Sequence, residues 1–179
     1  MHNSTFTDNT AQDDGGAIFW EGDNGLMCNI TCTNNKGISF NTSSSRGGSI
    51  CLSGDNVTVT KSHFTDSNIY IADDRDFSKV DGGAILITGN NVTVSETEFN
   101  DCSAINRGGA IYIMGNESQI LYCNFTYTQA YIGGAIFVEG NGAIIDNSLF
   151  RHNDGFNETK GGGSGGAIYV EVILWYFSF

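Results

Sequence analysis

One short phrase of glycines and large apolar residues recurs along the chain. It reads GGAIYIMGN from Gly108, and related phrases begin at Gly15, Gly47, Gly82, Gly133 and Gly165. The apolar positions shared by every copy lie two residues apart, which is the period of β-strands and not of helices. A chain that repeats itself in this way predicts a protein built from stacked structural repeats.

Each phrase opens a rigid unit, which we number from the first glycine of the pair as position 0. Position +3 is isoleucine in every copy, and +5 and +12 are also apolar wherever a copy reaches them. Position +17 holds Cys32, Phe64, Phe99, Phe125 and Phe150. We predict one strand around +3 to +5, a second strand that ends near +17, room for a third short strand, and a core in which equivalent residues stack.

The length of the repeat varies in one place. From +17 to the next glycine pair the chain runs for 15, 18, 9, 8 and 15 residues in successive repeats. Insertions confined in this way are typical of loops on one face of a stacked-repeat protein.

Two kinds of corner are predicted from the glycines. The pair at 0 and +1 indicates a corner where no Cβ fits. A glycine at +7 followed by Asp or Asn at +8 favours the left-handed backbone of a tight turn. Stacked side chains at +8 would form a hydrogen-bond ladder between repeats, and its members are Asp23, Asp55, Asn90, Asn116 and Asn141.

These patterns together predict an all-β fold, a right-handed parallel β-helix of five to six coils in a single domain over residues 1–179. Stacking pairs the free backbone N–H and C=O groups at the strand edges of each coil. Connections between parallel strands are almost always right-handed, which favours right-handed coiling. Neither end of the chain carries the polar cap that a solenoid needs, so we expect the domain to be a piece of a longer array or the product of a truncated reading frame.

Composition narrows the range of partners. A net charge of −12 with only eight Lys and Arg leaves no basic surface for nucleic acid. The five cysteines match no zinc-binding spacing and are interpreted as buried free thiols, so neither a metal nor a cofactor is expected. No signal peptide or transmembrane helix is visible, and any membrane association is expected only through parts of the protein outside this chain.

A candidate binding surface follows from the alternation of side chains. If +3 points inward, +4 points outward, and it reads Phe19, Cys51, Leu86, Tyr112, Phe137 and Tyr169. A continuous apolar stripe of this kind is typical of a surface that binds a protein or a sugar. The alternatives are that the long loops fold over the stripe, or that the two faces are reversed and these residues form the core.

The segments that precede the glycine pairs carry a resemblance. FTDNTAQDDGGAI from Phe6 and FNDCSAINRGGAI from Phe99 combine an FxxN-like start with GGA and an aliphatic residue. This pairing resembles the polymorphic outer membrane protein repeat of surface-exposed autotransporters and adhesin-like proteins. The Asn of FxxN is present as Asn9 and Asn153, whereas Ser67, Cys102 and Thr128 stand there in other repeats, and Cys32 replaces Phe ahead of Asn35.

The resemblance implies a non-catalytic, adhesin-like β-helical passenger at the cell surface, in the outer membrane if the source is a Gram-negative bacterium. Its partner would be a protein or glycan on a host or neighbouring cell. The motif residues are structural in that family, so the resemblance assigns no binding residue.

An enzyme is the alternative, because β-helices also carry polysaccharide lyases and glycoside hydrolases. Such a site would use the acids that precede the glycine pairs, and Asp14 and Asp81 would line one groove about 5 to 10 Å apart. The acids in question are Asp13, Asp14, Asp73, Asp74, Asp76 and Asp81. Clustered acids on loops are more often a solvated surface.

Overall fold

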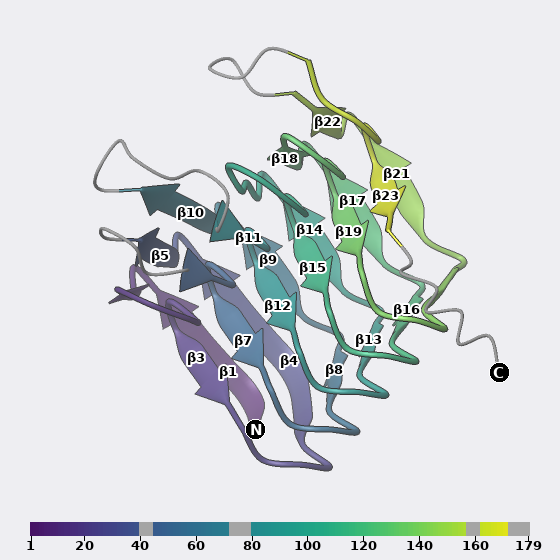
Figure 1. Ribbon diagram of the computed structural model, residues 1–179. Helices are drawn as coiled ribbons and strands as arrows, with labels where there is room; N and C mark the ends of the chain where they lie inside the picture. The colour runs from purple at the N-terminus through teal and green to yellow at the C-terminus, as the bar shows by residue number, and fades with distance from the viewer. Residues whose placement is uncertain (40–44, 72–79, 157–161, 172–179) are drawn as a thin grey trace, which may run out of the picture.

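The computed structural model describes residues 1–39, 45–71, 80–156 and 162–171. Within these ranges the secondary structure consists of β-strands without a helix, and all of the strand pairings are parallel. Strands of successive repeats lie beside one another, so the repeats form layers along one axis (Figure 1). The all-β prediction is confirmed, and the arrangement is consistent with a β-helix.

The first sheet contains one strand from each repeat, in sequence order (Figure 1). Its strands are β3 (Ile18–Trp20), β7 (Ile50–Leu52), β12 (Ile85–Ile87), β15 (Ile111–Ile113), β19 (Ile136–Val138) and β23 (Ile168–Val170). The register aligns equivalent positions, so Ile50, Ile85 and Ile111 are direct neighbours.

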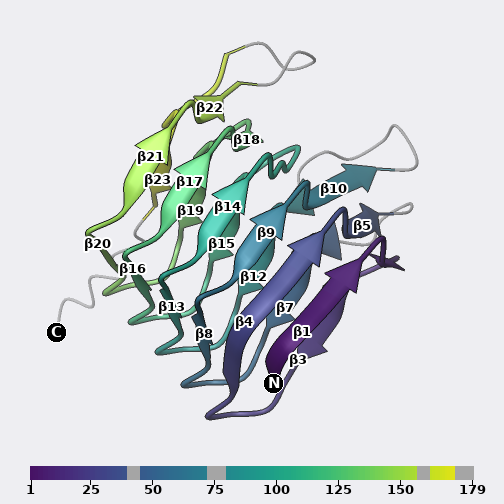
Figure 2. The ribbon, with the colours of Figure 1, turned by 180° about the vertical axis from the view of Figure 1, so that it is seen from behind.

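The second sheet lies behind the first, as Figure 2 shows. The long strand β4 (Leu26–Thr33) pairs with β1 (His2–Thr7) on one side and with both β8 and β9 on the other, so it joins two series of strands. One series is β8 (Thr58–Thr60), β13 (Thr93–Ser95), β16 (Gln119–Leu121) and β20 (Ile144–Asp146); the other is β9 (His63–Thr65), β14 (Glu98–Asn100), β17 (Asn124–Thr126) and β21 (Leu149–Arg151).

A third side of the molecule consists of short strands and single bridges. They are β2 (Thr10–Ala11), β5 (Lys36–Ser39), β6 (Ser45–Arg46), β10 (Asn68–Ile71), β11 (Val80–Asp81), β18 (Gln129–Ala130) and β22 (Asp154–Gly155). Bridges at Ser103 connect β10 to β18, and so continue the stack through the repeat that has no strand here. We call this the loop side, because each long insertion leaves the stack from it.

The core lies between the sheets and is made of the positions predicted from the repeat. Residues at +3, +5, +12 and +17 belong to one buried cluster or pack partly buried against it, except Val170 at +5, which is exposed. The rings of Phe64, Phe99, Phe125 and Phe150 stack nearly parallel, with neighbouring centroids 4.8 to 5.0 Å apart. This spacing equals the distance between strands in a sheet, so each ring packs on its equivalent in the next repeat.

The predicted second strand is wrong in one respect, because in most repeats it is broken into two. The break falls at +14, where Lys61, Glu96, Tyr122 and Asn147 have φ of 52°, 47°, 55° and 48°. The left-handed conformation interrupts the strand there, whereas β4 continues through Asn29, which has a φ of 57° at the same position. No glycine marks this position in the sequence, and the break therefore gave no signal.

The predicted left-handed corner at +7 and +8 is also corrected by the structure. The positive φ occurs one residue later, at +9, where Asn24, Asn56, Asn91, Glu117 and Gly142 stand. The glycine at +7 has a different purpose, because a Cβ on Gly115 would lie 1.8 Å from the carbonyl oxygen of Gly89 in the preceding repeat. Close approach of two backbones, and not backbone conformation, requires glycine here.

The prediction for the glycine pair is confirmed. Gly82 at position 0 has a φ of 71°, and a Cβ on Gly83 at +1 would lie 2.0 Å from the carbonyl oxygen of Gly109. The first glycine is needed for its left-handed conformation and the second for contact with the next repeat.

Ser118 is a weak point of the core, from which a stability prediction follows. Its hydroxyl is buried and has no hydrogen-bond partner among the described residues. The equivalent positions Val57 and Val92 are apolar and fully buried. Ser118→Ala is expected to raise the free energy of unfolding by about 1 kcal/mol, because an unsatisfied buried hydroxyl costs stability.

Urea unfolding of Ser118→Ala beside Ser62→Ala checks this prediction. The Ser62 hydroxyl donates to the carbonyl oxygen of Thr60 at 2.8 Å and accepts from the Ile30 amide at 3.1 Å. Ser62→Ala should therefore lower the stability by about 1 to 3 kcal/mol. Equal losses in both variants would contradict the assignment of Ser118.

Candidate functional site

The turn residues at +8 lie in a row along the stack. The side chain of each of the first four accepts a hydrogen bond from the backbone amide of its equivalent in the next repeat, at 2.7 to 3.0 Å, and the last residue only donates. The row runs through Asp23, Asp55, Asn90, Asn116 and Asn141. The like charges of Asp23 and Asp55 are accommodated because the donor is an amide N–H and not the second carboxylate.

The predicted apolar stripe points away from the main core but is mostly not exposed. Leu86, Tyr112 and Phe137 form a second buried cluster with Cys51, and Tyr169 packs partly buried against it. Phe19 differs from the others, since half of its surface is exposed. The expectation of an open stripe is thus corrected: the middle of the stripe has too little accessible surface to meet a partner, and Phe19 is its open member.

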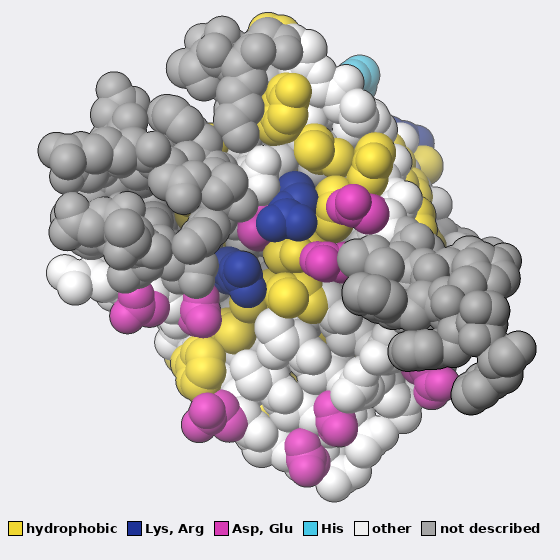
Figure 3. Space-filling view, in the orientation of Figure 1, with side chains coloured by type: hydrophobic (Ala, Val, Ile, Leu, Met, Phe, Trp, Pro, Cys, Tyr) yellow, Lys and Arg dark blue, Asp and Glu magenta, His cyan; other side chains and the backbone are white. Residues whose placement is uncertain are grey.

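Charged side chains lie over the middle of this buried cluster. Arg107 stacks on the rings of Tyr112 and Phe137, with its guanidinium carbon 5.0 and 5.2 Å from the two centroids. Tyr112 donates a hydrogen bond to Glu139, and burial, reinforced by this bond, raises the pKa of Tyr112. In Figure 3 basic and acidic side chains lie next to each other among hydrophobic ones in the centre of this face.

Position −1, just before each glycine pair, carries charges of alternating sign in the first four repeats. The order is Asp14, Arg46, Asp81 and Arg107. Asp81 is fully buried, and its carboxylate accepts from Asn106 at 2.9 Å and from Arg107 at 3.1 and 3.3 Å. Burial raises the pKa of Asp81 despite these partners, which favour the charged form.

The charged residues at position −1 include the two predicted catalytic acids, Asp14 and Asp81. Arg46 lies between Asp14 and Asp81, since its backbone amide donates to Asp14 at 3.0 Å and its guanidinium lies 4.0 Å from Asp81. Both oxygens of Asp81 accept hydrogen bonds inside the protein, so the two acids do not line an open groove. Opposite charges on neighbouring strands stabilise their pairing, and this is the role the geometry gives them. Asp73, Asp74 and Asp76 lie outside the described residues.

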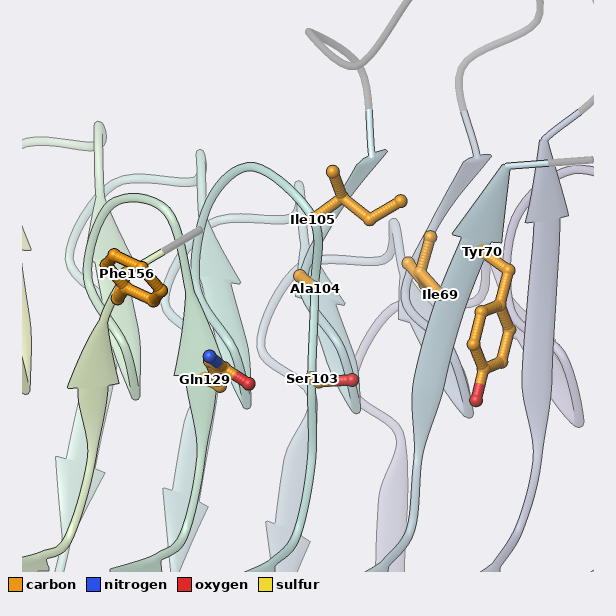
Figure 4. A pocket seen from close by; sticks show the side chains of 7 residues that line it. All are labelled: Ile69, Tyr70, Ser103, Ala104, Ile105, Gln129 and Phe156. Atoms are coloured by element: carbon orange, nitrogen blue, oxygen red, sulfur yellow. The ribbon is translucent and has the colours of Figure 1, made fainter. Parts of the chain in front are cut away.

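A hollow of about 250 Å³ lies on the loop side. Figure 4 shows Tyr70 at one end and Phe156 at the other, with Ser103 and Gln129 between them. Ile69 and Ala104 lie deeper and are buried. The two aromatic side chains are 46% and 41% exposed, so the hollow combines open aromatic surface with polar groups.

Sequence reasoning missed this hollow, although a signal for it exists. Three of its outer residues, Tyr70, Ile105 and Phe156, stand at position +23 of their repeats. The pairing of Lys36 with Asn68, and the bridges and pairing that continue it, keep position +21 in register through the stack. The rigid unit therefore extends to +21, four residues beyond the phenylalanine at +17.

Among the described residues, no group of three or more His, Cys, Asp or Glu side chains is arranged to hold a metal ion. The same part of the chain contains no helix long and apolar enough to cross a membrane.

The FxxN-like motif joins one repeat to the next. Asn35 accepts from the backbone and side chain of Asn9, at 3.0 and 2.9 Å, and donates to the carbonyl oxygen of Phe6 at 2.9 Å. Asn153 makes the equivalent contacts with Thr128 and Phe125. A family model described as the Chlamydia polymorphic membrane protein repeat matches residues 3–19, which include Phe6, Asn9 and the first glycine pair.

Residues 3–19 are thus similar to a polymorphic membrane protein repeat. The match covers the first copy of the motif, and the inter-repeat contacts of Asn153 show the same arrangement at the other end of the stack. The family of this repeat is not a family of enzymes. No curated protein and no solved structure matches the chain.

Proposed function

We propose that residues 1–179 are a single right-handed parallel β-helical domain of a surface-exposed, autotransporter-like passenger, and that this passenger attaches the cell to a protein or glycan on another cell. The observation that carries the proposal is the polymorphic membrane protein repeat in a chain whose repeats stack in register. In this proposal the domain lies at the cell surface, in the outer membrane of a Gram-negative source, and acts without catalysis.

The distribution of charge supports a binding role over a catalytic one. Asp81 is held by Arg107 and Asn106, and Asp14 by the amide of Arg46, so these acids stabilise the stack. The surface open to a partner is instead aromatic, at Phe19 and in the hollow between Tyr70 and Phe156. Exposed aromatic side chains are characteristic of binding surfaces.

An attachment assay tests the proposal without knowledge of the ligand. Beads coated with the purified chain are added to cultured epithelial cells, and bound beads are counted against beads coated with albumin. We expect severalfold more attachment by the coated beads, reduced when the cells are first treated with protease or with periodate. Attachment no better than that of albumin would contradict the proposal, as would release of reducing sugar from cell-surface glycans by the soluble chain.

A further inference from the structure

The loop side carries a row of outward residues that runs along the axis of the stack. Tyr70, Ile105 and Phe156 line the hollow and stand at the same position of the repeats that begin at Gly47, Gly82 and Gly133, and each repeat adds about 4.8 Å. Tyr70 and Phe156 are therefore three steps, or roughly 14 Å, apart. The hollow between them is long and follows the axis, as Figure 4 shows.

A second row of polar side chains runs beside the first. Ser103 and Gln129 belong to it, and both line the hollow. The Ser103 hydroxyl donates to Asn68 Oδ1 at 2.8 Å, which leaves its oxygen able to accept. Gln129 is exposed and offers both a donor and an acceptor.

Aromatic surface beside hydroxyl and amide groups is the chemistry that recognises a sugar. The apolar face of a pyranose ring packs on an aromatic ring, while its hydroxyls need donors and acceptors at the ring edge. In this hollow an apolar row and a polar row run side by side along the axis of the stack. Such a shape fits a linear chain of sugars better than a single sugar. The length of one repeat step is comparable to that of one pyranose unit.

Charge distinguishes among the glycans. The chain has a net charge of −12, which repels sialylated and sulfated sugars. Among the described residues, Lys36 lies beside the hollow, where its ammonium group is 5.8 Å from the centroid of the Tyr70 ring. An uncharged ligand avoids the repulsion.

We propose that the hollow binds a neutral, linear oligosaccharide that lies along the stack, with sugar rings on Tyr70 and Phe156 and hydroxyls bonded to Ser103 and Gln129. The inference rests on the proposed attachment function and names the ligand class for it. It places the binding surface on the loop side and away from the predicted stripe around Tyr112.

The test is a binding screen of the full chain on an array of neutral, sialylated and sulfated oligosaccharides, followed by titration of the best-bound soluble glycan. Tyr70→Ala and Phe156→Ala are each expected to weaken binding about tenfold. Tyr122→Ala is the matched control, because Tyr122 is 61% exposed but lies outside the hollow. It should leave the affinity unchanged, and circular dichroism should show all three variants folded.

Binding confined to charged glycans, no binding to any glycan, or equal loss in Tyr122→Ala would overturn the inference. The bead assay tests the attachment function separately from glycan binding. If beads attach to cells but neutral glycans do not bind, the ligand class is wrong and the attachment function stands. If neutral glycans bind through Tyr70 and Phe156 but beads do not attach, the hollow stands and the attachment function is wrong.

Discussion

Gly115→Ala is expected to lower the free energy of unfolding by at least about 4 kcal/mol. Only a few kinds of structural damage cause so large a loss from one substitution. The new Cβ would lie 1.8 Å from the carbonyl oxygen of Gly89 and 2.6 Å from its carbon. Both atoms belong to the backbone, so no side-chain rotation relieves the clash. The repeats would have to separate, which breaks the bonds from the Gly115 and Asn116 amides to the preceding repeat.

Gly22→Ala provides the control, because Gly22 occupies the same position in the first of these repeats. An added Cβ there meets only Trp20 Nε1, at an ordinary distance of 3.7 Å. We expect a change within about 1 kcal/mol. Urea unfolding of the two variants and the parent chain measures both effects, and similar stabilities for the two variants would contradict the account of position +7.

Alkaline pH is expected to destabilise the protein through its buried thiols. Burial raises the pKa of Cys32, Cys51 and Cys102 to about 12 and that of Cys123 to about 11. A thiol in the unfolded chain has a pKa of about 8.5 to 9. The folded state thus holds these protons more tightly, and its advantage is complete below about pH 8.5 and is lost as pH rises toward the folded pKa values.

The size of this effect follows from linkage. At pH 10 the ionisation of each thiol should lower the free energy of unfolding by about 1 to 2 kcal/mol relative to neutral pH, so the four together lower it by roughly 6 kcal/mol. That is comparable to the whole stability of a typical domain. The measurement is urea unfolding at pH 7.5, 9 and 10 under reducing conditions.

Cys102→Ala separates ionisation from packing in this experiment. Its smaller side chain should lower the stability at every pH, but the decline between pH 8.5 and pH 10 should shrink by about a quarter, since one of four thiols is gone. A stability that does not change with pH in this range would contradict the burial of the thiols.

The repeating part of the fold could be predicted from the sequence because equivalent residues must stack. Ile85 and Phe99 recur at fixed positions, and the structure pairs each with its equivalents. The breaks at +14 could not be predicted, since Lys61, Glu96 and Tyr122 share a backbone conformation but no side-chain chemistry. Any residue is tolerated there at a modest cost in strain.

The surface was harder to predict than the core. Alternation correctly places Tyr112 and Phe137 on the side of the sheet away from the main core, but it cannot say what covers them. Arg107 and Asp81 come from the segment before the glycine pair, whose register with +4 depends on the three-dimensional path of the chain. The row through Tyr70 and Phe156 follows +17 at a constant distance and could have been found by counting further.

Repeats that are far apart in sequence lie a fixed number of strand spacings apart in the stack. Leu26 and Ile144 are exposed, occupy the same position, and are connected through β4, β8, β13, β16 and β20. Spin labels on Leu26→Cys and Ile144→Cys, in a Cys28→Ser background, should therefore be about 19 Å apart, four steps of 4.8 Å. A narrow pulsed-EPR distribution centred near 19 Å supports the stack, and a broad distribution or one centred beyond roughly 30 Å would contradict it.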